Sequence, residues 1–265
     1  MIDKFDYEEP VCQLSCGKPT GTIPVSRIIE KVDGFFDRND YEEAGRLLVY
    51  WRNEAASLGD ARGELAMENE LVGYYRKQND KEKGLASVSR ALFLTEKLGQ
   101  GENASGATVI LNCATAYKAF GQPNEAMELY LCAEKIYKKV LSPSDTRFGG
   151  LYNNMALALA DLGREDEAER AYFAALAIME KAPDGEAERA ITYVNLAHMY
   201  EKFGRAERIS ECMEKAYGLL KSQNLPHDGY YAFVLEKCAP SFGYFGNVEA
   251  YNEFMKESKR IYAGN

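Results

Sequence analysis

The fold is decided by a recurring stretch, which reads NMALALADLGREDEAERAYFAAL at residues 154–176. A second copy, NCATAYKAFGQPNEAMELYLCAE at residues 112–134, lies 42 positions earlier and shares its Asn, its central Gly and its Ala positions. A third copy begins at Asn195, 41 positions after the first stretch. A fixed period of this length indicates a chain built from repeated structural units.

Six copies are found when the frame is extended toward both ends, and their anchor residues are 40, 42, 42, 41 and 42 positions apart. Apolar residues recur every three or four positions in each copy, as on an amphipathic helix, and a Gly or Asn breaks the pattern once. Each copy is therefore predicted to form two antiparallel helices. The anchors are Trp51, Ala91, Ala133, Ala175, Ala216 and Ser258.

The break in each copy marks the predicted end of its first helix. Glycine supplies the left-handed conformation that commonly ends a helix, and Asn is the usual substitute. We expect this role for Gly121, Gly163, Gly204 and Gly246, and for Asn39 and Asn79 in the first two copies.

A two-helix unit cannot bury its apolar face alone, so neighbouring units are expected to stack into a curved all-α solenoid over residues 25–265. Residues 1–24 precede it as a tail that is too rich in Gly and Pro, in GKPTGTIP, to form a helix. The predicted units are 25–64, 65–106, 107–148, 149–189, 190–231 and 232–265.

The spacing of small and aromatic residues resembles the tetratricopeptide repeat (TPR), carried by Ala114, Tyr117, Ala126, Tyr130 and Ala133 and by their equivalents 42 positions later. The longer period and the preceding Asn resemble the kinesin-light-chain-like subtype. This resemblance implies a right-handed α-solenoid of about six antiparallel helix pairs, a TPR-like superhelix that binds proteins or peptides. It is weaker at the two ends, where Pro240 is expected to interrupt a helix.

Composition narrows the classes of partner. The 265 residues are 46% hydrophobic and carry 32 Lys and Arg against 41 Asp and Glu, a formal charge of −9. This charge argues against binding to nucleic acid or to anionic membranes and favours a basic or neutral protein or peptide. The first residues lack a signal peptide and no stretch is apolar enough to span a membrane, so a cytoplasmic location is expected.

Neither a metal site nor a cofactor site is predicted. Reduced cysteines usually pack as small apolar residues, which is expected for Cys113, Cys132, Cys212 and Cys238. Cys12 and Cys16 lack the two further ligands that a zinc site needs. The sequence contains no HExxH motif, no phosphate-binding glycine loop and no supported nucleophile–histidine pair, so we expect a protein without catalytic activity.

One position of the first helices carries Asn in three consecutive units. It lies two residues before a buried small residue, so its side chain is expected to face away from the second helix. First helices line the concave surface of a superhelix of this kind. The residues at this position are Glu30, Glu70, Asn112, Asn154, Asn195 and Lys237.

An amide side chain can pair with the backbone of an extended peptide whatever its sequence, and Asn at this place lines the cargo-peptide groove of the kinesin-light-chain-like family. The alternative is that these Asn residues bond to neighbouring helices and rigidify the superhelix. His198 is expected to be a polar lining residue, not a catalyst. The predicted groove comprises Asn112, Asn154, Asn195, Asn153, Thr115, Lys118, Asn69, Arg76, His198 and Glu201.

Two functions follow. The first is a non-catalytic scaffold or adaptor that holds an extended peptide in the concave groove. The alternative is an assembly subunit that contacts itself, as a homo-oligomer, or a fixed partner through its end units or convex face, with Phe245 and Phe254 as candidate contacts. A further hypothesis places the stretch EEPVCQLSCGKPTGTIP in the groove as a pseudo-ligand.

Overall fold

The computed structural model describes residues 21–36, 38 and 40–264. Within them the chain forms twelve α-helices and one short 3-10 helix, with no strand. Asn39, Cys12, Cys16 and most of the tail lie outside the described residues. The helices are α1 (Val25–Phe36), α2 (Tyr41–Leu58), α3 (Ala61–Lys77), α4 (Lys81–Lys97), α5 (Ala104–Ala119), α6 (Pro123–Val140), α7 (Arg147–Asp161), α8 (Glu165–Met179), α9 (Glu186–Lys202), η1 (Ala206–Arg208), α10 (Ile209–Leu220), α11 (Gly229–Tyr244) and α12 (Val248–Tyr262).

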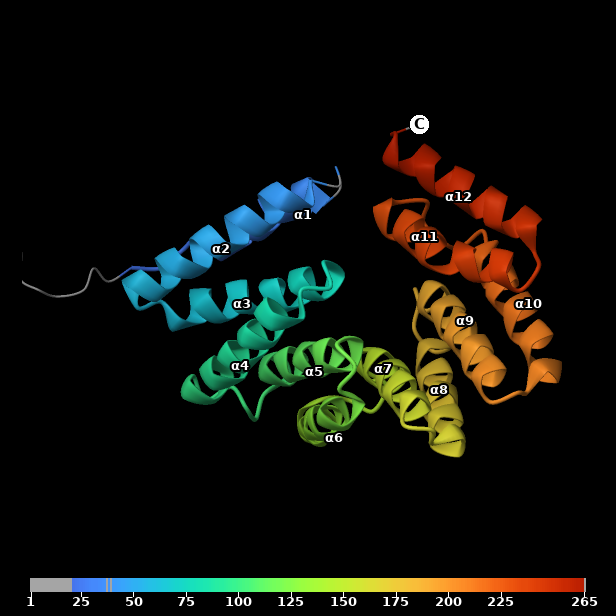
Figure 1. Ribbon diagram of the computed structural model, residues 1–265, viewed down its shortest axis with the longest axis horizontal. Helices are drawn as coiled ribbons and strands as arrows, with labels where there is room; N and C mark the ends of the chain where they lie inside the picture. Colours follow the sequence, from blue (N-terminus) through green and yellow to red (C-terminus); the bar gives the residue numbers. More distant parts are fainter. Residues whose placement is uncertain (1–20, 37, 39, 265) are drawn as a thin grey trace, which may run out of the picture.

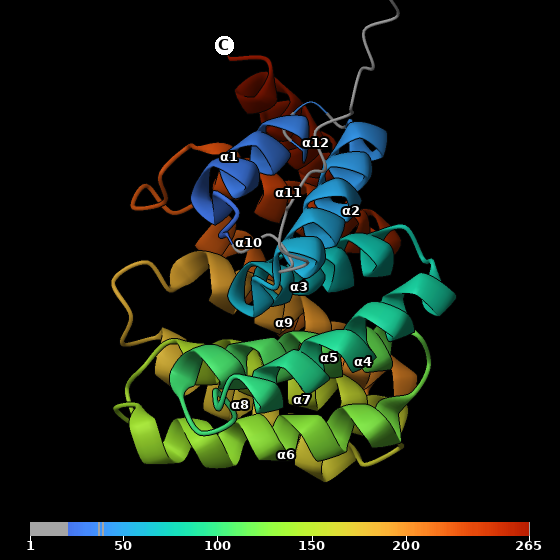
Figure 2. The same ribbon diagram turned by 90° about the vertical axis from the view of Figure 1, so that its left-hand side faces the viewer.

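The helices pack in consecutive pairs, and the six pairs wind into an arc, which makes the molecule an α-solenoid (Figure 1). The extensive contacts between non-consecutive helices join odd-numbered helices, such as α3 with α5 and α9 with α11. The odd-numbered helices therefore follow the shorter, inner path of the arc and form its concave face. The first and last pairs face each other across the opening of the arc, which the turned view also shows (Figure 2).

The predicted ends of the first helices are confirmed at the five positions that the structure describes, and Asn39 lies outside them. Gly121, Gly163, Gly204 and Gly246 have φ angles of 77°, 76°, 73° and 93°, and Asn79 takes the same left-handed conformation at 54°. This conformation lets the backbone turn sharply so that the next helix runs back along the previous one.

Small residues set the distance between the paired helices. Ala126 and Ala168 are fully buried, and Tyr130 and Tyr172 lie beside them in the core at 1% and 0% exposure. Ile209 stands where the fifth unit would have this Ala, and there the second helix is preceded by the 3-10 turn η1. The larger side chain therefore coincides with a helix that starts late.

Three details add to or correct the sequence analysis. The unit boundaries at residues 65, 107, 149, 190 and 232 lie within the first five residues of α3, α5, α7, α9 and α11. The expectation that Pro240 interrupts a helix is wrong, because α11 continues through it to Tyr244. Cys132 is exposed, whereas Cys113, Cys212 and Cys238 are buried, and burial raises the pKa of their thiols to about 12, 11 and 12.

The described residues contain no group of His, Cys, Asp and Glu arranged to hold a metal ion. In the same part of the chain, no helix combines the length and the apolar character needed to cross a bilayer.

Candidate functional site

Of the three Asn residues at the repeated position of the first helices, two join neighbouring units. Asn112 on α5 donates through Nδ2 to Oδ1 of Asn69 on α3, at 2.9 Å. Asn195 on α9 donates in the same way to Asn153 on α7, at 3.1 Å. Residues 43 and 42 positions apart therefore repeat one interaction on consecutive odd-numbered helices, as the alternative interpretation of these asparagines describes.

Asn154 differs from its two equivalents. The acceptor position in the preceding unit is occupied by Leu111, whose side chain cannot accept a hydrogen bond. Asn154 is half-buried and its amide forms no hydrogen bond with any described residue. The third Asn therefore keeps one acceptor and two donors available.

A carboxylate joins three units near the ends of the inner helices. Asp161 at the end of α7 lies 3.3 Å from Nζ of Lys118 on α5 and 3.1 Å from Nζ of Lys202 on α9. Both ion pairs are partly exposed, so each contributes little to the stability of the fold. Asp161 and Lys202 also occupy neighbouring groove positions in the repeat frame, and their spacing of 41 matches the repeat period.

Thr115 is engaged within its own unit. Its hydroxyl donates to the carbonyl oxygen of Leu111 at 2.9 Å and accepts from the hydroxyl of Tyr130 at 3.2 Å. Burial raises the pKa of Tyr130 to about 12, and the charge of Arg76 in the preceding unit partly opposes this shift. Arg76 itself is exposed and forms no ion pair with the described residues.

His198 and Glu201 contact the last unit. Nε2 of His198 lies 2.8 Å from the hydroxyl of Ser241, and the imidazole packs on the ring of Phe245 at 4.9 Å between centroids. The hydroxyl of Tyr244 donates to Glu201 at 2.5 Å. Sequence analysis did not predict the contacts of Ser241 and Tyr244 with the groove residues, because polar and aromatic residues replace the apolar pattern of the other units there.

Ser241, His198 and Glu201 are the residue types of a hydrolase triad, but they match such a triad in type only. Nδ1 of His198 is 3.6 Å from Glu201, beyond hydrogen-bond distance. Ser241 is buried inside α11, where backbone N–H groups are used by the helix and cannot form an oxyanion hole. These three residues therefore do not meet the geometric requirements of acyl transfer.

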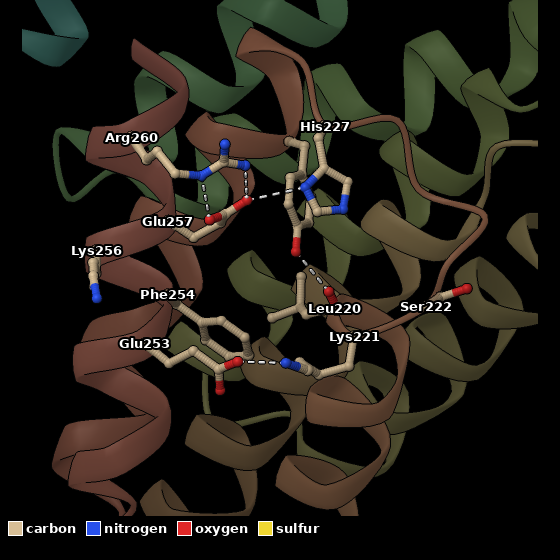
Figure 3. Close-up of a pocket in the computed structure, with 10 residues that line it drawn as sticks. Leu220, Lys221, Ser222, His227, Glu253, Phe254, Lys256, Glu257 and Arg260 are labelled. Carbon is tan, nitrogen blue, oxygen red and sulfur yellow. Dashed lines mark hydrogen bonds and ion pairs between the residues drawn. The ribbon is translucent and has the colours of Figure 1, made fainter. Parts of the chain in front are cut away.

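A separate pocket of about 470 Å³ lies between α12 and the loop that joins α10 to α11 (Figure 3). Its carboxylates are engaged within the pocket, since Glu257 pairs with Arg260 at 2.7 Å and lies 3.0 Å from Nδ1 of His227, and Glu253 pairs with Lys221. The contacts of Glu253 with Lys221 and of Glu257 with His227 attach the loop to the last helix, so neither carboxylate is without a partner.

A family model described as the tetratricopeptide repeat matches residues 148–222, which cover α7 to α10. No curated protein matches the sequence.

Several solved structures share the fold. One is a Podosopora anserina chain named as a kinesin light chain with nearly identical TPR-like repeats, which is 22% identical and has a TM-score of 0.60 over 74% of this chain and 94% of that one. BtubC (BKLC) from P. vanneervenii is 21% identical, with a TM-score of 0.51 over 92% of both chains. The Pseudomonas aeruginosa protein pilF is 15% identical, with a TM-score of 0.51 over 91% and 93%.

Proposed function

We propose that the chain is a non-catalytic scaffold that holds an extended peptide against its concave face, because it is an α-solenoid in which residues 148–222 match the tetratricopeptide repeat and which is similar in fold to kinesin-light-chain repeats. The observation that carries the proposal is the state of Asn154. Its two equivalents bridge adjacent helices, whereas its own amide has no partner among the described residues.

The proposal assigns different roles to the ten groove residues. Asn154 and exposed Arg76 supply the groups that contact the peptide. Of the other eight, seven hold the inner helices in register, so that these two groups keep their positions relative to each other, and Thr115 bonds within its own unit. An amide contact of this type adds only about 0.5–1.5 kcal/mol, so it sets the register of a peptide and does not select its sequence.

The test uses peptides selected from a random library displayed on phage for binding to the intact protein. We expect Asn154→Ala to weaken these peptides by about two- to tenfold, which corresponds to one lost hydrogen bond. Glu128→Ala, an exposed change on the even-numbered helix α6, is the control and should leave affinity unchanged. The groove proposal would be contradicted if Asn154→Ala left the affinity for these peptides unchanged while Glu128→Ala, or another change on an even-numbered helix, lowered it.

The assembly alternative also has a specific observation in its favour. Exposed apolar and aromatic side chains gather where α11 turns into α12, with Tyr244 at 66%, Val248 at 57% and Tyr251 at 36% exposure. Phe254, by contrast, is 1% exposed and belongs to the core, so its mutation would test folding. We expect Val248→Glu to abolish any self-association seen by analytical ultracentrifugation if this surface is the interface.

A further inference from the structure

The first and last helix pairs face each other across the opening of the arc (Figure 1), and residues from both ends line a cleft there. Its volume is about 580 Å³. We call it the end cleft. Its lining residues on the first two units are Asp33, Phe36, Tyr41 and Lys77, and those on the last unit are Gly229, Tyr230, Phe233, Glu236 and Tyr262.

Aromatic rings form much of both walls. Tyr230 and Phe233 on α11 are stacked at 6.3 Å between centroids with an interplanar angle of 28°, yet they remain 48% and 45% exposed. On the opposite wall, Nζ of Lys77 lies over the ring of Tyr41 at 4.4 Å. The faces of such rings attract cations, and one wall already holds a cation from the chain itself.

The charged groups of the end cleft are unbalanced. Asp33 and Glu236 approach it from opposite ends of the solenoid, and neither forms an ion pair or hydrogen bond with a described residue. Lys77 is the one basic residue among the lining residues. Burial raises the pKa of nearby Glu70, and the negative charge of Asp33 adds to this shift.

We propose that the end cleft binds an arginine side chain of a partner protein. A guanidinium group is planar, so it can stack on the exposed Tyr230 and Phe233 pair while its N–H groups donate to carboxylates. Asp33 and Glu236 supply those carboxylates from the two ends. The formal charge of −9 on the whole chain favours the approach of such a basic partner.

The test is a titration of the full chain with N-acetyl-L-arginine amide, followed by backbone amide chemical shifts in ¹H–¹⁵N NMR spectra at low salt. The citrulline analogue is the probe control, because it keeps the shape of arginine and lacks the charge. The double variant Asp33→Asn, Glu236→Gln removes both carboxylates from the cleft. The matched variant Glu96→Gln, Glu128→Gln makes the same charge change on the even-numbered helices α4 and α6.

We expect saturable shifts at Lys77 and at residues 229–236, at least tenfold weaker binding in the cleft double variant, and unchanged binding in the matched variant. The assignment to arginine would be overturned if the citrulline analogue, or N-acetyl-L-lysine amide titrated in the same way, bound as tightly as N-acetyl-L-arginine amide. Unchanged binding in the cleft double variant, or shifts confined to other helices, would overturn the site. No groove peptide is used, so the outcome is independent of the groove proposal.

Discussion

At the scale of single residues, Asn195 and Asn154 are chemically identical and differ in what they contact. Asn195→Ala should lower the free energy of unfolding by about 1 kcal/mol, because it breaks the bond to Asn153 and leaves a buried amide oxygen without its donor. Asn154→Ala should leave stability unchanged or raise it by up to ~0.7 kcal/mol, since Ala favours helix and no bond is lost. Urea unfolding of both variants measures the contrast, and equal losses would contradict it.

Two glycines near helix starts give a second residue-scale prediction. A Cβ atom on Gly106 would lie 1.9 Å from the backbone oxygen of Gln100, whereas one on Gly150 would meet nothing within 4 Å. Gly106→Ala should therefore destabilise the protein by about 1–3 kcal/mol, as overpacking does. Gly150→Ala should stabilise it by roughly 0.5–1 kcal/mol through helix propensity. Thermal melts that shift in the same direction for both would refute this account of Gly106.

At the scale of elements, Glu257 is one of two carboxylates of α12 that contact the segment between α10 and α11. Hydrogen bonds from Arg260, and then from His227, lower the pKa of Glu257 to about 2. A carboxyl whose folded pKa is depressed stabilises the fold above its unfolded pKa of about 4.3, and the contribution is lost as the pH falls toward 2.

Glu257→Gln should therefore lower the melting temperature at pH 7 and have a smaller effect at pH 3. Glu249→Gln on the same helix is the control, because Glu249 forms no ion pair with a described residue. An effect of Glu257→Gln that is equally large at both pH values would show that the ion pairs do not account for the stabilisation.

The helices themselves could be predicted from the sequence because their determinants are local. The period of three and four, the αL glycines and the buried alanines all act within one unit, and the helix ends at Gly121 and Gly163 follow from them. The path of α11 through Pro240 could not be predicted in this way. Its neighbours α9 and α12 hold that segment in place, and this packing is absent from the local pattern.

The candidate site was less predictable, because its state depends on pairs of residues in different units. The repeat frame placed Asn112, Asn154 and Asn195 at one position. Whether each is bonded depends on the residue of the preceding unit, which is Asn69, Leu111 and Asn153 in turn. The end cleft was missed altogether, since its residues are about 200 positions apart and meet only through the curvature of the whole arc.

At the scale of the whole molecule, units contact mainly their neighbours, so a local defect should spread over a short distance. Tyr172→Ala removes a fully buried ring from α8 and should reduce amide hydrogen-exchange protection in α7, α8 and the adjoining α6 and α9, with little change in α1 to α3. Phe173→Ala, at the next position and 45% exposed, is the matched control and should change little. Equal loss of protection along all helices would show that the solenoid unfolds as one cooperative body.

The position of the end cleft has a mechanical consequence. A small rotation between two adjacent units moves everything beyond that interface, and rotations at successive interfaces add together. The distance between α1 and α11 therefore changes more than any distance inside a unit when the solenoid flexes. Asp33 and Glu236 line the cleft between these two ends. A ligand that draws them together would therefore change the rotation at every interface of the arc.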